Sequence, residues 1–290
     1  MNLLEDLRLT DNNNGGCCFL YYHRIGDMYK GVRNISVSTH NFIAHIRYLR
    51  EHFLIRKFDD DSDYCRERTI IVGFDDGYRD VYEIVFPIIE KYKVPIAIFM
   101  VSGGIGGSEL WNDRLERIWL KRGKDVINEY YQLHRLVRSH FQPSKLEEFL
   151  YLQEHLLGIC IDDKDQNRLL NEKELRELSD SPLVTIGGHT FSHSDLSFLS
   201  REDQFREIAE DKKVLESVIG KEITSFSYPF GGVGDDTAYI LKKVGYKRAR
   251  CSTKGIANNK TDRYLIPGYS VRDISIDEFK IFINSIWQNY

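Results

Sequence analysis

The sequence lacks the cysteine content of a small secreted protein. Only five of its 290 residues are cysteines. An odd number cannot all pair, and a chain of this length buries enough apolar surface to fold without cross-links. Cys17 and Cys18 are adjacent in a run typical of a strand, so their side chains would point to opposite faces. We therefore expect reduced thiols, as in a cytosol-like compartment.

Long hydrophobic runs are also absent. The longest dense apolar stretch covers 94–101, whereas a membrane-spanning helix needs roughly 20 apolar residues. The N-terminal segment 1–16 contains Glu5, Asp6 and Asp11 and no apolar core of a signal peptide. The sequence thus predicts no transmembrane segment and a cytoplasmic protein.

Basic charge is not in excess. The chain has 40 Lys and Arg against 44 Asp and Glu, a formal net charge of −4, and its basic residues are not clustered. A nucleic-acid-binding surface usually carries a basic patch, so we expect no nucleic-acid partner. A neutral, carbohydrate-like ligand is compatible with this balance, and the oligomeric state is not indicated.

Short apolar runs alternate with longer segments of helical period. This alternation predicts an α/β fold in which helices cover a parallel sheet. Helical stripes follow Ser38 or Thr39, Ser200 and Ser275, which are residue types that cap helices. The seven predicted strands are 17–22, 69–74, 95–101, 183–186, 223–228, 246–251 and 265–271.

One stretch interrupts the alternation. From 103 to about 180 there is no convincing strand, which predicts a helical insertion at about 104–180 within a single domain of residues 1–290. The insertion is either a lid or binding surface, or a solvated helical addition. Its aromatic residues would stack on sugar rings or only pack between helices; they are Trp111, Trp119, Tyr130, Tyr131, Phe141, Phe149 and Tyr151.

The first chemical motif is GFDDG at 73–77, directly after an apolar run. It places Asp75 and Asp76 at the carboxyl end of a buried strand, where parallel α/β folds have their sites. Adjacent carboxylates repel, so a pair of this kind divides two tasks: one binds a metal and the other remains a base. The alternative interpretation is an ordinary Asp-Gly turn.

The second motif is HTFSH at 189–193. His189 and His193, four residues apart, would meet on one side of a helical turn and bind one cation. No Glu lies between them, so this is not the metalloprotease helix. Taken alone, the pair could be surface or core histidines; with one Asp it forms a ligand set that leaves positions open for water and substrate.

The third motif is FSYPFGG at 226–232. Pro229 fixes the backbone after a strand, so the amide of Phe230 could donate to a developing oxyanion. The alternative is a turn that only ends the strand.

In this order and spacing, the three motifs resemble the polysaccharide deacetylase family, carbohydrate esterase family 4. The resemblance extends from about 19 to 271, and the segments 19–25, 110–115 and 175–178 look like a bacterial branch with an N-terminal Tyr-His element and a helical insertion. It implies a distorted (β/α)7 barrel of parallel strands, in agreement with the seven predicted strands.

The resemblance also implies roles for the motif residues. By analogy, Asp75 is the general base, and Asp76, His189 and His193 hold a divalent metal. One carboxylate and two imidazoles suit zinc best, although cobalt, nickel and iron bind such sets as well.

The sequence departs from the family at two places. Many members carry an Arg two residues ahead of the Pro in the third motif, where this chain has Ser227. The general-acid His usually lies near the C-terminus, but this chain has no His after His193. His23, which follows the first strand, is the candidate acid; alternatively, it only hydrogen-bonds a ligand or a carboxylate. The remaining histidines are expected on the surface; they are His40, His45, His52, His134, His140 and His155.

The expected function is metal-dependent hydrolysis of the N-acetyl group of an amino sugar. A cytoplasmic protein would meet a nucleotide- or lipid-linked intermediate of cell-surface polysaccharide biosynthesis. The same site could instead remove a formyl group or an O-acetyl ester. A carbohydrate-binding protein that keeps the fold and the metal without turnover is the alternative outside enzymes.

Overall fold

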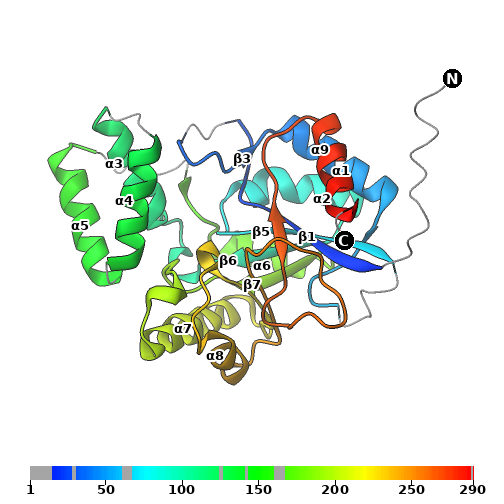
Figure 1. Cartoon of the computed structure of the whole chain (residues 1–290). Helices are drawn as coiled ribbons and strands as arrows, with labels where there is room; N and C mark the ends of the chain where they lie inside the picture. The colour runs from blue at the N-terminus through cyan, green and yellow to red at the C-terminus, as the bar shows by residue number, and fades with distance from the viewer. Residues whose placement is uncertain are drawn as a thin grey trace.

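A parallel sheet of short strands forms the centre of the molecule (Figure 1). The computed structural model describes residues 15–27, 31–60, 67–123, 127–140, 143–159, 167–288 and 290. All seven strands expected from the sequence are present. In sheet order they are β10 (Gly268–Ser270), β1 (Gly16–Tyr22), β5 (Arg68–Phe74), β6 (Ile96–Met100), β7 (Val184–Gly188), β8 (Ser225–Ser227) and β9 (Arg248–Arg250).

The sheet nearly closes into a barrel. Every neighbouring pair in this order is parallel. At the open edge, Ala249 of β9 donates its N–H to the carbonyl of Arg263 at 2.8 Å and accepts from the N–H of Ile266 at 3.0 Å. The segment that contains Arg263 and Ile266 leads into β10, which pairs with β1. The distorted (β/α)7 barrel of parallel strands is therefore confirmed.

Alternate side chains of each strand fill the barrel or face the helices. In β1, Cys17 and Phe19 belong to the small interior cluster, whereas Cys18 contributes to the outer core beneath the helices. A Cβ on Gly73 would lie 2.5 Å from the Phe19 ring, so this glycine leaves room for the aromatic side chain that fills the barrel.

The described cysteines, Cys17, Cys18 and Cys251, are buried in the core. Their expected reduced state stays a prediction. Cys65 and Cys160 lie outside the described residues, as does segment 1–14, on which the signal-peptide prediction rests.

Helices lie above and below the strands in Figure 1, around the outer face of the barrel. The Ser38 and Ser200 side chains cap the first turns of two of them, and Gly220 ends the second with a φ of 68°. The α-helices are α1 (Thr39–His52), α2 (Phe86–Tyr92), α3 (Trp111–Lys121), α4 (Ile127–His140), α5 (Pro143–Leu156), α6 (Glu172–Asp180), α7 (Arg201–Ile219), α8 (Thr237–Val244) and α9 (Ile276–Gln288). Short elements complete the fold: β2 (Arg24–Ile25), β3 (Ser36–Val37), β4 (Leu54–Ile55), the π-helix η1 (Val81–Val85) and the 3-10 turns η2 (Ser102–Gly104), η4 (Leu196–Phe198) and η5 (Pro229–Gly231).

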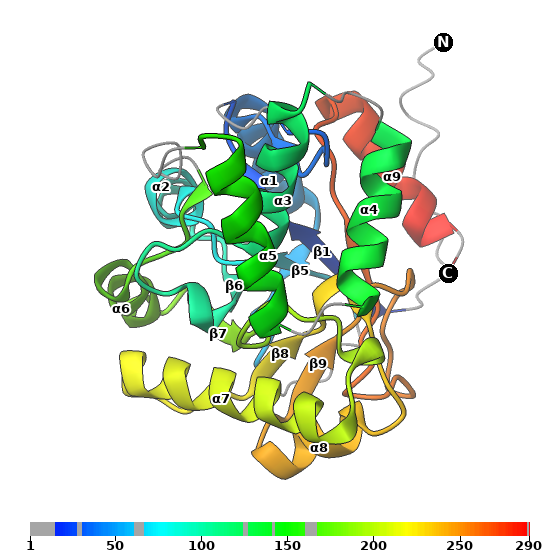
Figure 2. The ribbon, with the colours of Figure 1, turned by 90° about the vertical axis from the view of Figure 1, so that its left-hand side faces the viewer.

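Three helices of the predicted insertion pack on one another at one end of the molecule (Figures 1 and 2). Helices α3, α4 and α5 share a separate apolar cluster, whose buried members are Trp111, Leu115, Ile118, Trp119, Tyr130, Val137, Leu146 and Leu150. The predicted range 104–180 extends further, and its last helix, α6, packs Leu175 and Leu178 into the main core. Phe141 and residues 160–166 lie outside the described residues, and the assignment of 1–290 to one domain stays a prediction.

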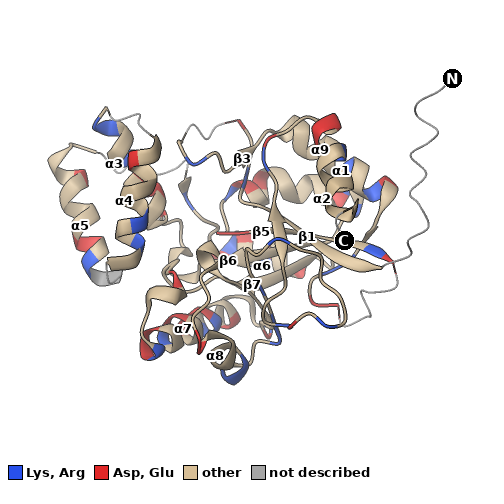
Figure 3. Ribbon diagram, in the orientation of Figure 1, with Lys and Arg blue, Asp and Glu red and all other residues tan. Residues whose placement is uncertain are grey.

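Charged residues of both signs are interspersed along α4, α5 and α7 (Figure 3). None of the helices in the described part of the chain is both long and apolar enough to cross a membrane.

Two histidines expected on the surface are buried instead. His45 of α1 is fully covered, and its ring stacks on Phe279 of α9 with centroids 3.9 Å apart. His134 of α4 lies against the indole of Trp111, with ring centroids 5.0 Å apart. The polar sequence around each one suggested exposure, but contacts with distant segments decide the burial of a side chain.

Candidate active site

The two acidic residues of the first motif lie at the carboxyl end of β5, as predicted. The N–H of Asp75 donates to the carbonyl of Tyr22 at the end of β1, 3.0 Å away, which fixes the turn against the neighbouring strand. Asp76 has a φ of 75°, a left-handed conformation that is uncommon for a residue with a side chain. This turn directs both carboxylates into the molecule, where each is at most 3% exposed.

The two histidines of the second motif follow β7. His189 continues the strand, with its N–H bonded to the carbonyl of Met100 at 3.0 Å. The predicted helical turn between the histidines is wrong: Thr190 and His193 have φ values of 65° and 58°, and the segment is a loop. The left-handed residues fold the loop back on itself, so the two rings still meet, with centroids 5.2 Å apart.

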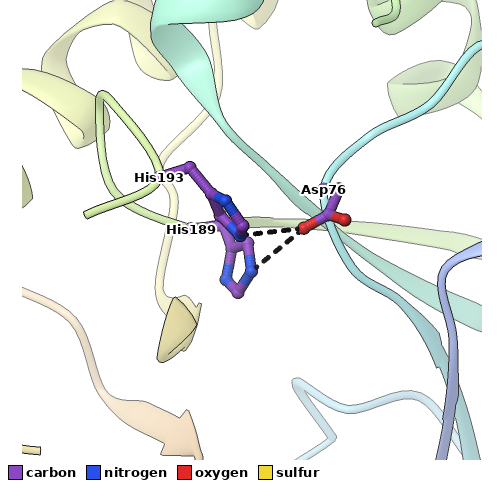
Figure 4. Close-up of side chains that lie close together, drawn as sticks. All are labelled: Asp76, His189 and His193. Atoms are coloured by element: carbon purple, nitrogen blue, oxygen red, sulfur yellow. Dashed lines mark ion pairs between the residues drawn. The ribbon is translucent and has the colours of Figure 1, made fainter. Parts of the chain in front are cut away.

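Asp76, His189 and His193 converge on one point (Figure 4). The Oδ1 atom of Asp76 lies 3.4 Å from Nε2 of His189 and 3.1 Å from Nε2 of His193. One ligand atom from each residue lies within 4.8 Å of the other two, and all three side chains are buried. This set could hold a metal ion.

The chemistry of the donors fits a divalent cation. His189 shares a hydrogen bond of 2.7 Å between its Nδ1 and the carbonyl of Ser227, so Nδ1 carries a hydrogen and Nε2 is the ring nitrogen that faces Asp76 and remains to bind a cation. Burial alone would raise the pKa of Asp76, but His193 and His189 hold it well below its ordinary value. Burial would lower the pKa of His189, whereas the hydrogen bond and charge of Asp76 together with the charge of Asp75 raise it. Asp76 therefore stays negatively charged within the cluster, and its carboxylate attracts a cation.

Neighbouring side chains hold the loop between the two histidines. The Glu207 carboxylate of α7 accepts from the N–H of Ser192 at 2.9 Å and from its hydroxyl at 2.7 Å. The indole N–H of Trp111 donates to the carbonyl of His193 at 3.1 Å. An insertion helix and a barrel helix therefore both fix the position of the His193 ring.

Asp75 has two partners of its own. The Ser227 hydroxyl donates to its Oδ1 at 3.2 Å, and the Arg250 guanidinium donates to its Oδ2. Arg250 also bonds the Ser227 oxygen at 2.5 Å, and its guanidinium lies 3.9 Å from the centre of the Tyr21 ring. These contacts orient a second carboxylate beside the Asp–His–His cluster.

Arg250 is the residue that the sequence analysis missed. The predicted strand 246–251 contained a usable signal, since Arg250 is a charged residue near its carboxyl end. The Ser at position 227 indicated that the usual Arg of the third motif is absent, but it gave no indication of which residue replaces it. In space, a guanidinium from β9 reaches the carboxylate beside Ser227.

His23 and Phe230 line the same pocket of about 320 Å³ as the two aspartates and the two histidines. His23 is half-buried. Burial lowers its pKa, and the negative charges of Asp76 and Asp75 only partly offset this shift. Phe230 has a φ of 57°, and its ring lies 4.7 Å from the His193 ring. The structure thus brings all six predicted site residues together, and their roles remain proposals.

The fold and this site are those of a hydrolytic enzyme built on a (β/α) barrel. The sequence profile of the family described as polysaccharide deacetylase matches residues 63–249. This match covers more than half of the chain, and the chain belongs to the polysaccharide deacetylase family. Its assignment to the branch with an N-terminal Tyr-His element stays a prediction.

Relatives and solved structures agree with this assignment. The chain is 24% identical over 251 residues to poly-beta-1,6-N-acetyl-D-glucosamine N-deacetylase of Staphylococcus aureus, covering 84% of this chain and 70% of the relative. The structure of deacetylase PplD of Streptococcus pyogenes in complex with acetate has a TM-score of 0.64 and 15% identity, covering 94% of this chain and 99% of PplD. IcaB from Ammonifex degensii has a TM-score of 0.63 and 16% identity, with 94% and 97% covered. At these identities the structural likeness extends to the fold alone.

Proposed function

We propose that the protein is a metal-dependent deacetylase that removes the N-acetyl group from an amino sugar within a glycan. The observation that carries the proposal is the buried Asp76, His189 and His193 cluster beside the separately oriented Asp75 carboxylate. Family membership and the N-deacetylase activity named for the Staphylococcus aureus relative support it.

Asp76, His189 and His193 would hold the cation, with zinc as the first choice and cobalt, nickel or iron as alternatives. A divalent cation bound there would lower the pKa of a water molecule and polarise the acyl carbonyl.

The chain's own residues divide the proton transfers. Asp75, oriented by Ser227 and Arg250, takes a proton from the attacking water. The amide of Phe230 donates to the oxygen that becomes negative when the carbonyl carbon is attacked. His23 then protonates the nitrogen as the C–N bond breaks, which releases acetate and the free amine. A hydrogen bond from His23 to a neighbouring group is the alternative role.

The charges of the pocket favour a neutral sugar over a phosphorylated one. Arg33 is paired with Asp113 and Glu116, and Arg138 lies 3.1 Å from Asp195. The two pocket arginines apart from Arg250 are thus already balanced by carboxylates. The nucleotide- or lipid-linked sugar expected from the sequence carries phosphate, so these charges argue against it, and a substrate panel that contains both kinds of sugar tests the choice.

Four single substitutions test the roles. Asp75→Asn is expected to keep the metal and to lower acetate release at least about 100-fold, the effect of removing a general base. Asp76→Ala and His193→Ala are expected to lose the metal itself. His23→Ala would keep the metal and lower turnover. Acetate release and bound metal, measured on each purified variant, check all four.

Unchanged metal content in Asp76→Ala and His193→Ala would contradict the ligand assignment, and wild-type turnover in His23→Ala would remove His23 as the acid. Formate release from an N-formyl sugar, or acetate release from an O-acetyl sugar, measured beside the N-acetyl substrate, identifies the acyl group. Binding of intact glycan without product would favour a carbohydrate-binding protein.

A further inference from the structure

The helical insertion forms one wall of the catalytic pocket. Tyr131, His134 and Arg138 of α4 are spaced three and four residues apart, so they share one face of the helix. All three line the pocket that contains Asp75 and the Asp–His–His cluster, together with Asn112 from the first turn of α3. In Figure 1, α4 lies on the barrel side of α5. A substrate bound in this pocket would therefore contact the insertion.

His134 lines this pocket and has a buried ring nitrogen without a hydrogen-bond partner among the described residues. Its side chain is 9% exposed and is held by aromatic contacts, at 5.0 Å from the Trp111 ring and 5.4 Å from the Phe230 ring. Within the described part of the chain, its buried Nε2 has no hydrogen-bond partner. Burial, with the charges of Arg33 and Arg138, lowers its pKa to about 3, so the ring is neutral near pH 7.

Asn112 repeats this pattern on the same wall. It is 3% exposed, and its backbone carbonyl accepts from the Tyr130 hydroxyl at 3.3 Å. Its buried side-chain Oδ1 has no partner among the described residues. Since buried polar groups are almost always hydrogen-bonded, two such atoms from uncharged side chains of this one wall indicate a ligand that supplies the missing bonds.

The charge and polarity of the wall residues indicate the chemical class of that ligand. Arg138 is paired with Asp195, and its guanidinium lies 4.8 Å from the centre of the Phe230 ring, so the wall offers neutral polar atoms beside aromatic rings. A pyranose ring has this character, with hydroxyls around its edge and apolar C–H faces. A fatty chain would leave Asn112 and His134 unpaired, and a phosphate group would find no free positive charge on this wall.

We propose that Asn112 and His134 hydrogen-bond the hydroxyls of the sugar ring that carries the acyl group, so that the insertion determines the sugar specificity of the enzyme. This inference rests on the proposed function, since it assigns the residues that read the substrate of that same site. The metal and Asp75 act on the acyl group, whereas the insertion acts on the ring. The two contributions are therefore separable.

The test compares a sugar substrate with an ester that has no ring hydroxyls. The sugar is a short β-1,6-linked N-acetylglucosamine oligomer, and the ester is 4-nitrophenyl acetate. His134→Phe keeps an aromatic ring against Trp111 but removes both nitrogens, and His134→Gln keeps a hydrogen-bonding end. The ratio of kcat/KM for the sugar to that for the ester is expected to fall about 10- to 100-fold in His134→Phe and in Asn112→Ala, mainly through KM. His134→Gln would stay within about fivefold of the wild type.

His140→Gln is the matched control, because His140 is an exposed histidine of the same helix outside the pocket. The proposal is overturned if His134→Phe retains the wild-type ratio, or if it loses both activities in equal proportion with its metal intact. Calorimetric titration of the oligomer into Asp75→Asn, alone and combined with His134→Phe, measures binding without turnover. If the wild type releases no acetate from any sugar, the proposed deacetylation fails, and these titrations still decide whether His134 binds the ring.

Discussion

Backbone strain gathers at the residues of the candidate site. Asp76, Thr190, His193 and Phe230 all have positive φ values, although none of them is glycine. Such conformations cost on the order of 1–3 kcal/mol each and persist only where the surroundings impose them. Here the surroundings include the Trp111 bond to the His193 carbonyl. The directions of the site's side chains are therefore fixed by the fold before any ligand binds.

The guanidinium that bonds Asp75 comes from Arg250 in this chain, and not from position 227 as in many family members. It bonds both Asp75 and Ser227, and it is 2% exposed. The sequence of many family members has an Arg at the position of Ser227, from which it would reach the same carboxylate. A serine there leaves space that the guanidinium from β9 occupies. In this chain, the guanidinium that bonds Asp75 thus comes from a different strand.

Replacing Arg250 tests this role. Arg250→Ala should lower kcat about 10- to 100-fold with a smaller change in KM, because Asp75 loses a charge-assisted hydrogen bond while the residues proposed to bind the sugar ring stay in place. Metal content should stay that of the wild type, because Arg250 bonds Asp75 and Ser227 and none of the three ligand residues. Steady-state kinetics and metal analysis check both statements.

The double variant Ser227→Arg with Arg250→Ser supplies the control. It returns the guanidinium to the position where other family members have it, so it should recover most of the lost kcat. A double variant as slow as Arg250→Ala would mean that Arg250 supports the barrel and does not orient the base.

At the scale of elements, the sequence predicts what depends on local pattern. The seven strands were recognised because each is a short buried run, and the helix ends because Ser38, Ser200 and Gly220 cap them through neighbouring backbone groups. Contacts between distant elements leave no such pattern. His45 lies in a polar helical sequence, and its burial depends on α9, more than 220 residues later in the chain.

His45 links α1 to the end of β1 and to the segment that follows β10, the neighbour of β1 in the sheet. Its Nε2 shares a hydrogen bond of 2.9 Å with the carbonyl of Ile274, and its Nδ1 lies 3.4 Å from the Tyr22 hydroxyl. Burial lowers its pKa from 6.5 to about 4. The hydrogen bond to Ile274 and the charge of Asp273 act in the opposite direction but are weaker. Between these two pH values the unfolded chain binds a proton that the folded protein does not.

This difference makes stability depend on pH. The contribution of His45 is complete above about pH 6.5 and is lost as the pH falls toward 4, because protonation then favours the unfolded chain; by pH 5 the loss is about 2 kcal/mol. His45→Gln cannot titrate, so its deficit in unfolding free energy relative to the wild type should shrink by about that amount between pH 7.5 and 5. Urea unfolding at several pH values measures it. His40→Gln, at an exposed position of the same helix, is the matched control, and a constant difference for His45→Gln would refute the assignment.

At the scale of the whole molecule, the candidate metal site joins two strand tips. Asp76 follows β5, and His189 and His193 follow β7, with β6 between them in the sheet. Asp76 lies more than 110 residues before the two histidines in the sequence, and the insertion helices lie between them in the chain. The sequence predicted that the two motifs lie together because parallel strands bring their carboxyl ends together, and the family resemblance implied which residues form the ligand set. The sequence left open whether the insertion would cover the same edge.

A cation at this junction should stabilise the entire fold. The unfolded chain has no preformed ligand set, so binding favours the folded state by about 2.7 kcal/mol when the free metal is at 100 times its Kd. For a chain of this size, that corresponds to a rise in Tm of about 5 °C.

Differential scanning calorimetry with zinc and with chelator should show this rise in the wild type and in Asp75→Asn, which keeps all three ligands. Asp76→Asn should show little of it, because a neutral amide replaces the carboxylate between the two imidazoles. An equal rise in Asp76→Asn would place the stabilising cation elsewhere in the chain.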